Sequence, residues 1–286
     1  MLLLTERSEI STGAWDMLEN EKIMKSVQCR ITNWRKFASE VRSGGCNLLA
    51  RLDEFPNSIL VSGCQRSGTT MLSRLITQSE GMVNYWFGRD DELDAALILS
   101  GFEPHTPRGR YCFQTTYLNE CYHEYFEHKM GHKIIWVLRN PFSVVRSILF
   151  NWRRFALNEL FRGCGTYLLS DKEKRRYNLL GVWGISKLKR ACLSFNGKVS
   201  QVFELNDRIG KDGMLVVDYD ELVRQKQHIL PLIYRFIDLP YRDVYCHKIQ
   251  SKSINKASRL SKREYALIKE LCSPVYDRVR TLLLNF

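Results

Sequence analysis

Short apolar runs along the chain predict the strands of a buried sheet. The runs at 59–61, 134–138 and 214–217 have strand length and contain β-branched residues. Uninterrupted runs of this kind are typical of parallel strands that are covered on both faces. Segments with helical periodicity follow two of the runs, at 69–76 and 141–149. This alternation predicts an α/β fold, a single domain with a central parallel sheet flanked by helices.

Weaker patterns predict the remaining elements. They are a strand at 82–87, a polar helix at 119–132, basic helices within 151–212, a helix at 228–239 and a basic loop at 251–259. Ser261 and Glu264 form a capping box that opens another helix. Pro274 is expected to break that helix, because proline removes a backbone donor, and a last helix then spans 275–284.

The first 57 residues are harder to assign to secondary-structure elements than the rest of the chain. Their apolar positions suggest one or two amphipathic helices, and we expect residues 1–57 to be an N-terminal helical extension packed on the domain 58–286. A lid over an acceptor site or a dimer arm is the alternative. The chain has no internal repeat or low-complexity tract that would mark a further domain.

The net charge indicates which classes of partner to expect, and the cysteine content indicates which cellular compartment. The formal net charge of +12 suits anionic ligands, among them phosphorylated small molecules, nucleic acid and acidic membranes. The nine cysteines are odd in number and include no C-x-x-C pair, which argues against a disulfide framework and favours a reducing, cytoplasmic location. The chain has no run of about eighteen apolar residues, so no membrane span is expected.

The loop after the first strand has the layout of an anion-binding site. Gly63 and Gly68 bracket a polar loop between a strand and a helix, the spacing of a nucleotide P-loop. Thr69 stands where that motif has its lysine, and Arg66 supplies a cation inside the loop instead. Unpaired amides at the start of the helix and the helix dipole both favour an anion there. An ordinary strand–turn–helix is the alternative interpretation.

A second candidate site follows the run at 134–138. Arg139 comes directly after this strand, at the edge where open α/β sheets bind ligands. Asn140 and Pro141 are a helix start, with asparagine as the cap and proline at the first helical position. Ser147 lies about two turns further along that helix. A strand-end salt bridge and a solvent-facing serine are the alternative roles.

Both sites together resemble one family. The segment Gln65-Arg66-Ser67-Gly68-Thr69-Thr70 resembles the 5′-phosphosulfate loop of sulfotransferases that use 3′-phosphoadenosine 5′-phosphosulfate (PAPS), in the version with arginine found in bacterial and tyrosylprotein members. Arg139 and Ser147 match the family's second motif, which binds the 3′-phosphate. The resemblance implies a P-loop-like sulfotransferase fold for 58–286, and a loop site for PAPS made of Gly63, Cys64, Gln65, Arg66, Ser67, Gly68, Thr69 and Thr70.

The resemblance extends more weakly toward the C-terminus. Tyr219-Asp220-Glu221-Leu222 is similar to the family's Tyr-Glu-Asp-Leu segment with the two acids exchanged, which makes Tyr219 a candidate contact near the adenine. A buried core tyrosine is the alternative. A basic loop near the C-terminus of the family also holds the 3′-phosphate, and Lys256 and Arg259 match it by position and charge only.

The expected general base differs from that of the cytosolic animal sulfotransferases, which place a histidine before the second motif. The family's Lys-Thr-His segment corresponds here to 114–116, which contains neither lysine nor histidine. Members with arginine in the loop often use a carboxylate after the first helix, and this implies Glu92 as the base, with His105 as the second choice. A solvated acid at a helix N-terminus is the alternative role for Glu92. Arg66 is expected to stabilise the leaving group.

The function implied is transfer of a sulfuryl group from PAPS, without a metal, to a hydroxyl or amine of an acceptor, releasing 3′,5′-adenosine bisphosphate. Carbohydrate, lipid, peptide and small-molecule acceptors stay open, and the oligomeric state is not predicted. The alternatives are a divergent P-loop kinase, which the missing lysine disfavours, and a catalytically silent nucleotide-binding or nucleic-acid-binding protein, which the charge of +12 motivates.

Overall fold

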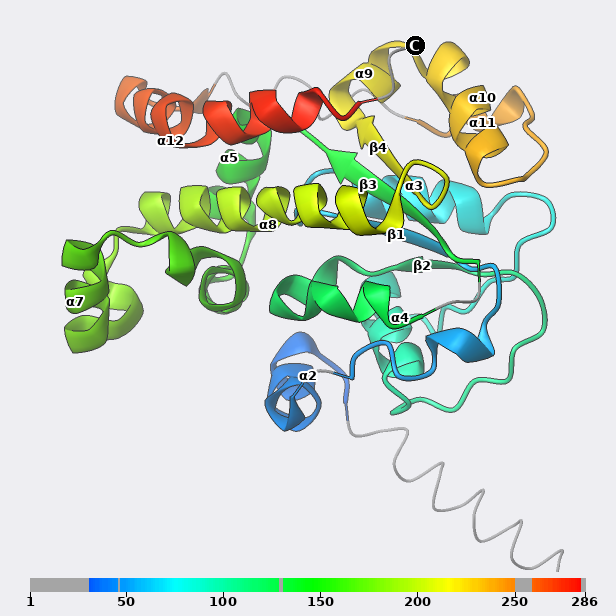
Figure 1. Ribbon diagram of the computed structural model, residues 1–286, viewed down its shortest axis with the longest axis horizontal. Coiled ribbons are helices and arrows are strands. Elements are labelled where there is room, and N and C mark those ends of the chain that lie inside the picture. The colour runs from blue at the N-terminus through cyan, green and yellow to red at the C-terminus, as the bar shows by residue number, and fades with distance from the viewer. Residues whose placement is uncertain (1–30, 46, 129–130, 250–258, 284–286) are drawn as a thin grey trace, which may run out of the picture.

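A four-stranded parallel sheet forms the centre of the molecule (Figure 1). The computed structural model describes residues 31–45, 47–128, 131–249 and 259–283. The strands are β1 (Ile59–Gly63), β2 (Cys112–Gln114), β3 (Lys133–Leu138) and β4 (Met214–Asp218), and their spatial order is β2-β1-β3-β4. Every neighbouring pair is parallel, so all four carboxyl ends meet at one edge of the sheet. The predicted α/β architecture is confirmed.

Helices cover both faces of this sheet, which explains the uninterrupted apolar runs. Leu60, Trp136 and Val216 face one layer, which contains α4 (Asp91–Leu99), α5 (Pro141–Asn151), α8 (Lys187–Ile209) and α12 (Lys262–Arg280). Val61 and Val217 face the other layer, which contains α3 (Thr69–Thr77), α9 (Tyr219–Arg224), α10 (Lys226–Phe236) and α11 (Val244–His247). Successive strand residues alternate between the two layers, as the pleat requires.

The predicted starts of two helices are confirmed in atomic detail. Asn140 caps α5, its Oδ1 accepting a hydrogen bond of 2.9 Å from the amide of Ser143, and Pro141 is the first helical residue. Ser261 and Glu264 make the reciprocal bonds of a capping box at the start of α12. Both caps satisfy amides that the first helical turn leaves without partners.

Smaller elements lie at the two ends of the sheet. Before β1 the chain forms α2 (Trp34–Glu40) and the 3₁₀ turns Arg42–Gly44 and Leu52–Glu54. Phe37, Leu49 and Phe55 from this part of the chain are buried in the same layer as α4. The expected extension 1–57 falls largely outside the described residues, and the boundary at residue 57 stays a prediction. Beyond α5 the chain forms α6 (Arg154–Leu160), a π turn (Phe161–Gly165), a 3₁₀ turn (Thr166–Leu168), α7 (Asp171–Leu180) and a 3₁₀ turn (Gly181–Gly184).

Three predictions about elements are wrong. The segment 82–87 is not a strand, because Met82 makes only an isolated bridge to Arg110, and the edge strand is the shorter β2. The expected polar helix at 119–132 is a 3₁₀ segment (Thr116–Phe126) whose residues are mostly buried. Pro274 does not break its helix: its ring is exposed and α12 continues through it, because packing on α8 and α5 outweighs the missing donor.

The cysteines also differ from expectation. Six described cysteines are buried free thiols, but Cys121 is disulfide-bonded. The compartment stays a prediction. Within the described ranges, none of the helices combines the length and apolarity that crossing a bilayer requires.

Candidate functional site

The candidate residues converge at the carboxyl edge of the sheet. The glycine loop follows β1, Arg139 follows β3, and Tyr219 follows β4. Leu138 and Asp218 are register partners, so Arg139 and Tyr219 are the next residues of two adjacent strands. The guanidinium carbon of Arg139 lies 4.5 Å from the centre of the Tyr219 ring. The parallel topology therefore places these segments side by side, although they lie far apart in sequence.

Close backbone approach explains both glycines of the loop. A Cβ at Gly63 would lie 2.4 Å from the carbonyl oxygen of Val137, and a Cβ at Gly68 would lie 2.1 Å from the Tyr219 ring. The φ angles are +138° and +105°, which side chains rarely tolerate. Arg66, between the glycines, also has a positive φ, of 73°. The loop is thus held in a conformation that few residues adopt freely.

The loop ends at the N-terminus of α3 with unsatisfied donors. Gly68 caps this helix without a side-chain hydrogen bond. We find no hydrogen bond from the amides of Gly68, Thr69 or Thr70 to another described residue. Three amides at a helix N-terminus, together with the helix dipole, form an anion site.

Two guanidinium groups lie beside these amides. Arg139 is buried and donates from Nη1 to the carbonyl oxygen of Arg66 at 3.5 Å, and its Nε lies 3.4 Å from Oδ1 of Asp220. Arg66 donates from Nε to Oγ of Ser147 at 3.0 Å. Burial, and secondarily the charge of Arg139, lower the pKa of Arg66. Two like charges held this close favour an anion between them.

One cavity of about 490 Å³ joins these groups. Of the predicted donor-site residues, it is lined by Gln65, Arg66, Gly68, Thr69, Thr70, Arg139, Ser147 and Tyr219. Gly63, Cys64 and Ser67 do not line it. Cys64 and Ser67 are buried below the loop, where the Ser67 hydroxyl donates to the Cys64 carbonyl oxygen at 2.6 Å, so these residues shape the turn.

Glu92 lines the same cavity at the start of α4. Thr116 donates its hydroxyl to Oε1 of Glu92, and Gln114 donates from Nε2 to Oε2 at 3.3 Å. Gln114 also donates to the Thr69 hydroxyl at 3.2 Å, which links the carboxyl group to the glycine loop. Burial, with a smaller contribution from Asp90, raises the pKa of Glu92 to about 8. A carboxyl group with such a pKa is mostly protonated at neutral pH and becomes an effective proton acceptor as the pH rises through about 8.

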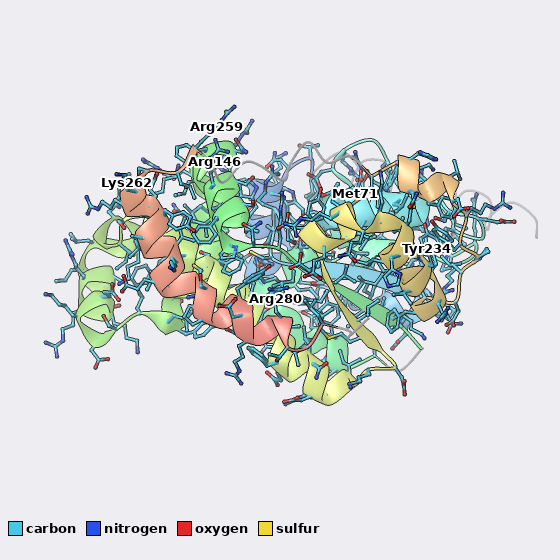
Figure 2. All side chains as sticks on the ribbon, turned by 90° about the horizontal axis from the view of Figure 1, so that it is seen from above. Met71, Arg146, Tyr234, Arg259, Lys262 and Arg280 are labelled. Atoms are coloured by element: carbon cyan, nitrogen blue, oxygen red, sulfur yellow. The ribbon has the colours of Figure 1, made fainter. Side chains whose placement is uncertain are left out.

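The other predicted residues lie elsewhere. His105 does not line the cavity; its Nε2 lies 3.2 Å from the hydroxyl of Tyr111 and its ring stacks on Phe55, so we no longer propose it as a base. Arg259 is exposed, lies just before α12 (Figure 2), and does not line the cavity. Lys256 lies outside the described residues.

The Tyr219 ring packs between the glycine loop and Arg139. The glycine loop packs on its ring at Gly68, and the Arg139 guanidinium lies over it. These contacts favour a role in supporting the loop and orienting Arg139. The predicted adenine contact stays a prediction.

Sequence reasoning missed the middle and the far end of the cavity. Gln114 is the last residue of β2 and Thr116 follows it, and their position at a strand end was the signal that could have marked them. The far end is built by α2, by α6 and by the residue that caps the end of α5, and includes Trp34, Trp152 and Phe155. No periodicity or motif connects these distant segments, so only the fold brings them together.

Comparisons with known proteins concern the fold alone. No family model matches the chain, and no curated protein matches it. Solved structures similar to it are sulfotransferases. A sulfotransferase from Mycobacterium tuberculosis H37Rv is 10% identical over 90% of this chain and 85% of its own, with a TM-score of 0.47. One from Mycobacterium avium is 13% identical over 97% and 87%, with a TM-score of 0.45. A mouse sulfotransferase complexed with PAP is 15% identical over 82% and 92%, with a TM-score of 0.44. These values are too low to carry an activity from those proteins to this chain.

Proposed function

We propose that this protein transfers a sulfuryl group from PAPS to an acceptor hydroxyl. The observation that carries the proposal is the single cavity in which the amides of the glycine loop, two guanidinium groups and a basic carboxyl group meet. The motifs that resemble PAPS-dependent sulfotransferases lie at this cavity, on Arg66–Thr70 and on Arg139 with Ser147.

The residues of the cavity fit a donor with two separated anionic groups. The amides at the start of α3 and the Arg66 side chain suit the 5′-phosphosulfate, and Arg139 with Ser147 suits the 3′-phosphate. An anion also relieves the repulsion between Arg66 and Arg139, which adds to the effect of burial in lowering the pKa of Arg66. PAPS supplies the activated sulfuryl group when it is bound.

The protein's own groups accept the proton of the acceptor and stabilise the leaving group. Glu92 accepts the proton of the acceptor hydroxyl as the acceptor oxygen forms its bond to sulfur. The bond between sulfur and the phosphate oxygen breaks, and the charge that develops on that oxygen is stabilised by Arg66 and by the loop amides. The products are a sulfate ester and 3′,5′-adenosine bisphosphate, with the proton on Glu92.

A kinase is less well supported. Thr69 replaces the lysine that holds the terminal phosphates in P-loop enzymes, and no lysine is found among the described residues that line the cavity. ATP turnover that requires magnesium would favour this alternative. Binding of RNA or DNA without affinity for the donor would favour a nucleic-acid-binding protein.

Calorimetry with 3′,5′-adenosine bisphosphate and 5′-AMP tests the proposal. We expect the bisphosphate to bind at least tenfold more tightly than AMP, because only the bisphosphate has a 3′-phosphate. Arg139→Ala should weaken bisphosphate binding roughly 30-fold or more, about 2 kcal/mol, and should change AMP binding little. Arg153→Ala, an exposed arginine that does not line the cavity, is the matched control.

Two results would contradict the proposal. Equal affinity of the wild-type protein for both nucleotides would exclude a 3′-phosphate site. An equal loss of affinity for both nucleotides in Arg139→Ala would show that the substitution disrupts the cavity instead of removing a phosphate contact. The conservative variant Arg139→Lys would then have to restore AMP binding for Arg139 to remain the 3′-phosphate contact.

A further inference from the structure

The end of the cavity beyond Glu92 has apolar walls. They come from α2, from the 3₁₀ segment and from the α6 region, and comprise Trp34, Phe37, Ala38, Tyr117, Trp152, Phe155, Ala156 and Leu160. Trp34 and Phe155 are only partly buried, so their rings keep apolar surface available inside the cavity. Apolar surface left exposed in a cavity indicates an apolar occupant.

Contacts between aromatic rings hold these walls in place. The Trp34 ring lies 5.3 Å from Phe37 and 6.1 Å from Tyr117, measured between ring centres. The guanidinium carbon of Arg35 lies 5.3 Å from the centre of the Phe155 ring, so α2 is tied to α6 across the cavity. Such rings accept a flat aromatic molecule in offset or edge-to-face contact.

The charged groups at this end already have partners. Arg74 donates to Asp91 at 3.0 Å, Arg89 pairs with Glu103 at 2.9 Å, Arg42 lies 3.5 Å from Glu120, and Glu159 pairs with Arg162 at 2.6 Å. Asp90 accepts hydrogen bonds from two amides at the start of α4. Among the described residues, the charged side chains of this end are therefore already paired, which disfavours an acidic acceptor.

Resting on the proposed function, we infer that the acceptor is an uncharged aromatic alcohol of the phenol class. Its ring lies between α2 and α6, and its hydroxyl points to Glu92, which lines the same cavity. The sulfuryl group then moves from the donor phosphate to the phenol oxygen, and the phenol proton moves to Glu92. Trp34 and Phe155 determine which acceptor binds.

A steady-state assay with PAPS and matched acceptors tests this inference. The probes are 2-naphthol, which is uncharged and aromatic, 6-hydroxy-2-naphthoate, which adds a carboxylate, and glucose. We expect transfer to 2-naphthol, at least tenfold weaker transfer to the charged analogue, and none to glucose. Phe155→Ala should raise the KM for 2-naphthol at least tenfold and leave the affinity for 3′,5′-adenosine bisphosphate unchanged. Val244→Ala, exposed and outside the cavity, is the control.

The outcomes separate the two proposals. Tight bisphosphate binding with transfer to glucose and not to 2-naphthol would overturn the acceptor class and leave the sulfotransferase assignment intact. An unchanged KM in both Trp34→Ala and Phe155→Ala would overturn the placement of the acceptor between α2 and α6. Failure to bind the bisphosphate would instead refute the proposed function, and the acceptor inference with it.

A separate observation concerns α7 and the turn that follows it. Leu179 is 84% exposed, Leu180 55% and Trp183 72%, although neighbouring Gly184 and Ile185 are buried. Figure 1 shows α7 at one end of the molecule, well away from the sheet. Three large apolar side chains grouped in sequence and exposed to this extent mark an interaction surface.

Basic residues accompany these side chains on the same helix. Arg175 and Arg176 precede Leu179 and Leu180 by four residues, which places them one turn away on the same faces of α7. Lys172 and Lys174 add charge on α7, and all four basic residues are exposed. The guanidinium carbon of Arg154 lies 4.6 Å from the centre of the Trp183 ring. Exposed leucine and tryptophan beside arginine and lysine are typical of segments that lie in a membrane interface.

We propose that this surface, Leu179, Leu180 and Trp183 with the basic residues of α7, docks the protein on an anionic lipid bilayer. The three apolar side chains enter the interface and the basic side chains contact the headgroups. Charge complementarity selects a membrane over a second copy of this basic chain, whose surface would repel it.

Co-sedimentation with vesicles tests the docking. We expect binding to vesicles of phosphatidylcholine with phosphatidylserine, little binding to phosphatidylcholine alone, and release by salt. Replacing Leu179 and Trp183 together by serine should reduce binding at least tenfold, while Val244→Ser, which removes another exposed apolar side chain, should not. Equal binding of the two variants would overturn the proposal. So would a lipid-free dimer that dissociates in the double variant, since the surface would then bind a second copy.

Discussion

At the scale of single residues, Glu92 is the group whose chemistry is easiest to test. Burial raises its pKa to about 8, so the protonated acid predominates at neutral pH. Since a general base acts in its ionised form, we expect kcat/KM for sulfuryl transfer to rise with pH through about 8. Glu92→Gln should lower the rate by roughly 10²- to 10⁴-fold and abolish this rise. A variant that kept the rate and its pH dependence would exclude Glu92 as the base.

The same residue makes stability depend on pH. The pKa of Glu92 in the folded chain lies above its ordinary value of 4.5. The folded state therefore binds more protons between these pH values, and stability that is present below pH 4.5 is lost as the pH rises through about 8. We expect Glu92→Gln to flatten this part of the profile, which chemical denaturation at a series of pH values would measure. Parallel profiles for both proteins would show that the carboxyl group is not desolvated.

Lys198 offers an opposite case in the core. Its side chain on α8 is completely buried, Nζ has no hydrogen-bond partner among the described residues, and burial lowers its pKa. An unsatisfied buried amine is costly, so we expect Lys198→Met, which nearly keeps the volume, to raise the free energy of unfolding by about 1–3 kcal/mol. Thermal or denaturant unfolding measures the difference, with Lys187→Met on the exposed start of the same helix as the control.

The pH dependence gives an independent check on Lys198. The unfolded chain holds the proton up to the ordinary pKa of 10.5, whereas the folded chain loses it at lower pH. The unfolded state thus binds more protons in this window, and wild-type stability rises with pH relative to Lys198→Met. The advantage of the variant should shrink as the pH rises toward the ordinary lysine pKa of 10.5. An advantage that stayed constant, or a less stable variant, would show that the amine is satisfied.

At the scale of elements, the glycine loop depends on its contact with Tyr219. We expect Gly68→Ala to destabilise the protein by more than about 2 kcal/mol and to abolish binding of 3′,5′-adenosine bisphosphate, because the new Cβ would overlap the Tyr219 ring. Gly210→Ala is the control, because Gly210 also has a positive φ, of +75°, but a Cβ there would have no neighbour within 4 Å. It should cost about 1–3 kcal/mol through backbone strain alone and keep the affinity. Calorimetry and unfolding of both variants make the comparison; similar affinities would show that the loop tolerates a shift.

The elements that sequence reasoning found share a property that a sequence displays. The strands β1, β3 and β4 contain the apolar runs at 59–61, 134–138 and 214–217, and the start of α5 has a cap and a proline in consecutive positions. The strand β2 has only three residues, too few for a periodic signal, and its pairing with β1 is set by the tertiary fold. The continuation of α12 through Pro274 likewise depends on packing against other helices.

The residues of the site also divide into those that a sequence motif predicts and those that only the fold brings together. Arg66, Arg139 and Ser147 were predicted because a motif specifies both residue type and spacing, and the fold places all three at one cavity. His105, the second choice for the general base, matched no motif and lies outside that cavity. Trp34 and Phe155 carried no signal, because a wall assembled from two distant helices leaves no pattern in either of them.

At the scale of the whole molecule, the parallel sheet is what turns separate segments into one site. The donor end of the cavity lies on the loops after β1, β3 and β4, and the apolar end on α2 and α6. The first group sits on the rigid centre of the fold, whereas the second belongs to elements at its margin. Donor binding and acceptor choice are therefore expected to respond to different substitutions.

Ligand-linked stability tests this division across the whole chain. A ligand that binds only the folded state stabilises it by about 2.7 kcal/mol at one hundred times its dissociation constant, which for a chain of this size raises the melting temperature by roughly 5 °C or more. We expect 3′,5′-adenosine bisphosphate to produce this shift in the wild-type protein and in Trp34→Ala, and to produce little in Arg139→Ala at the same concentration. Differential scanning fluorimetry with AMP as the reference ligand measures it. A shift that Trp34→Ala abolished would mean that the nucleotide occupies the apolar end, and the assignment of the two ends would have to be reversed.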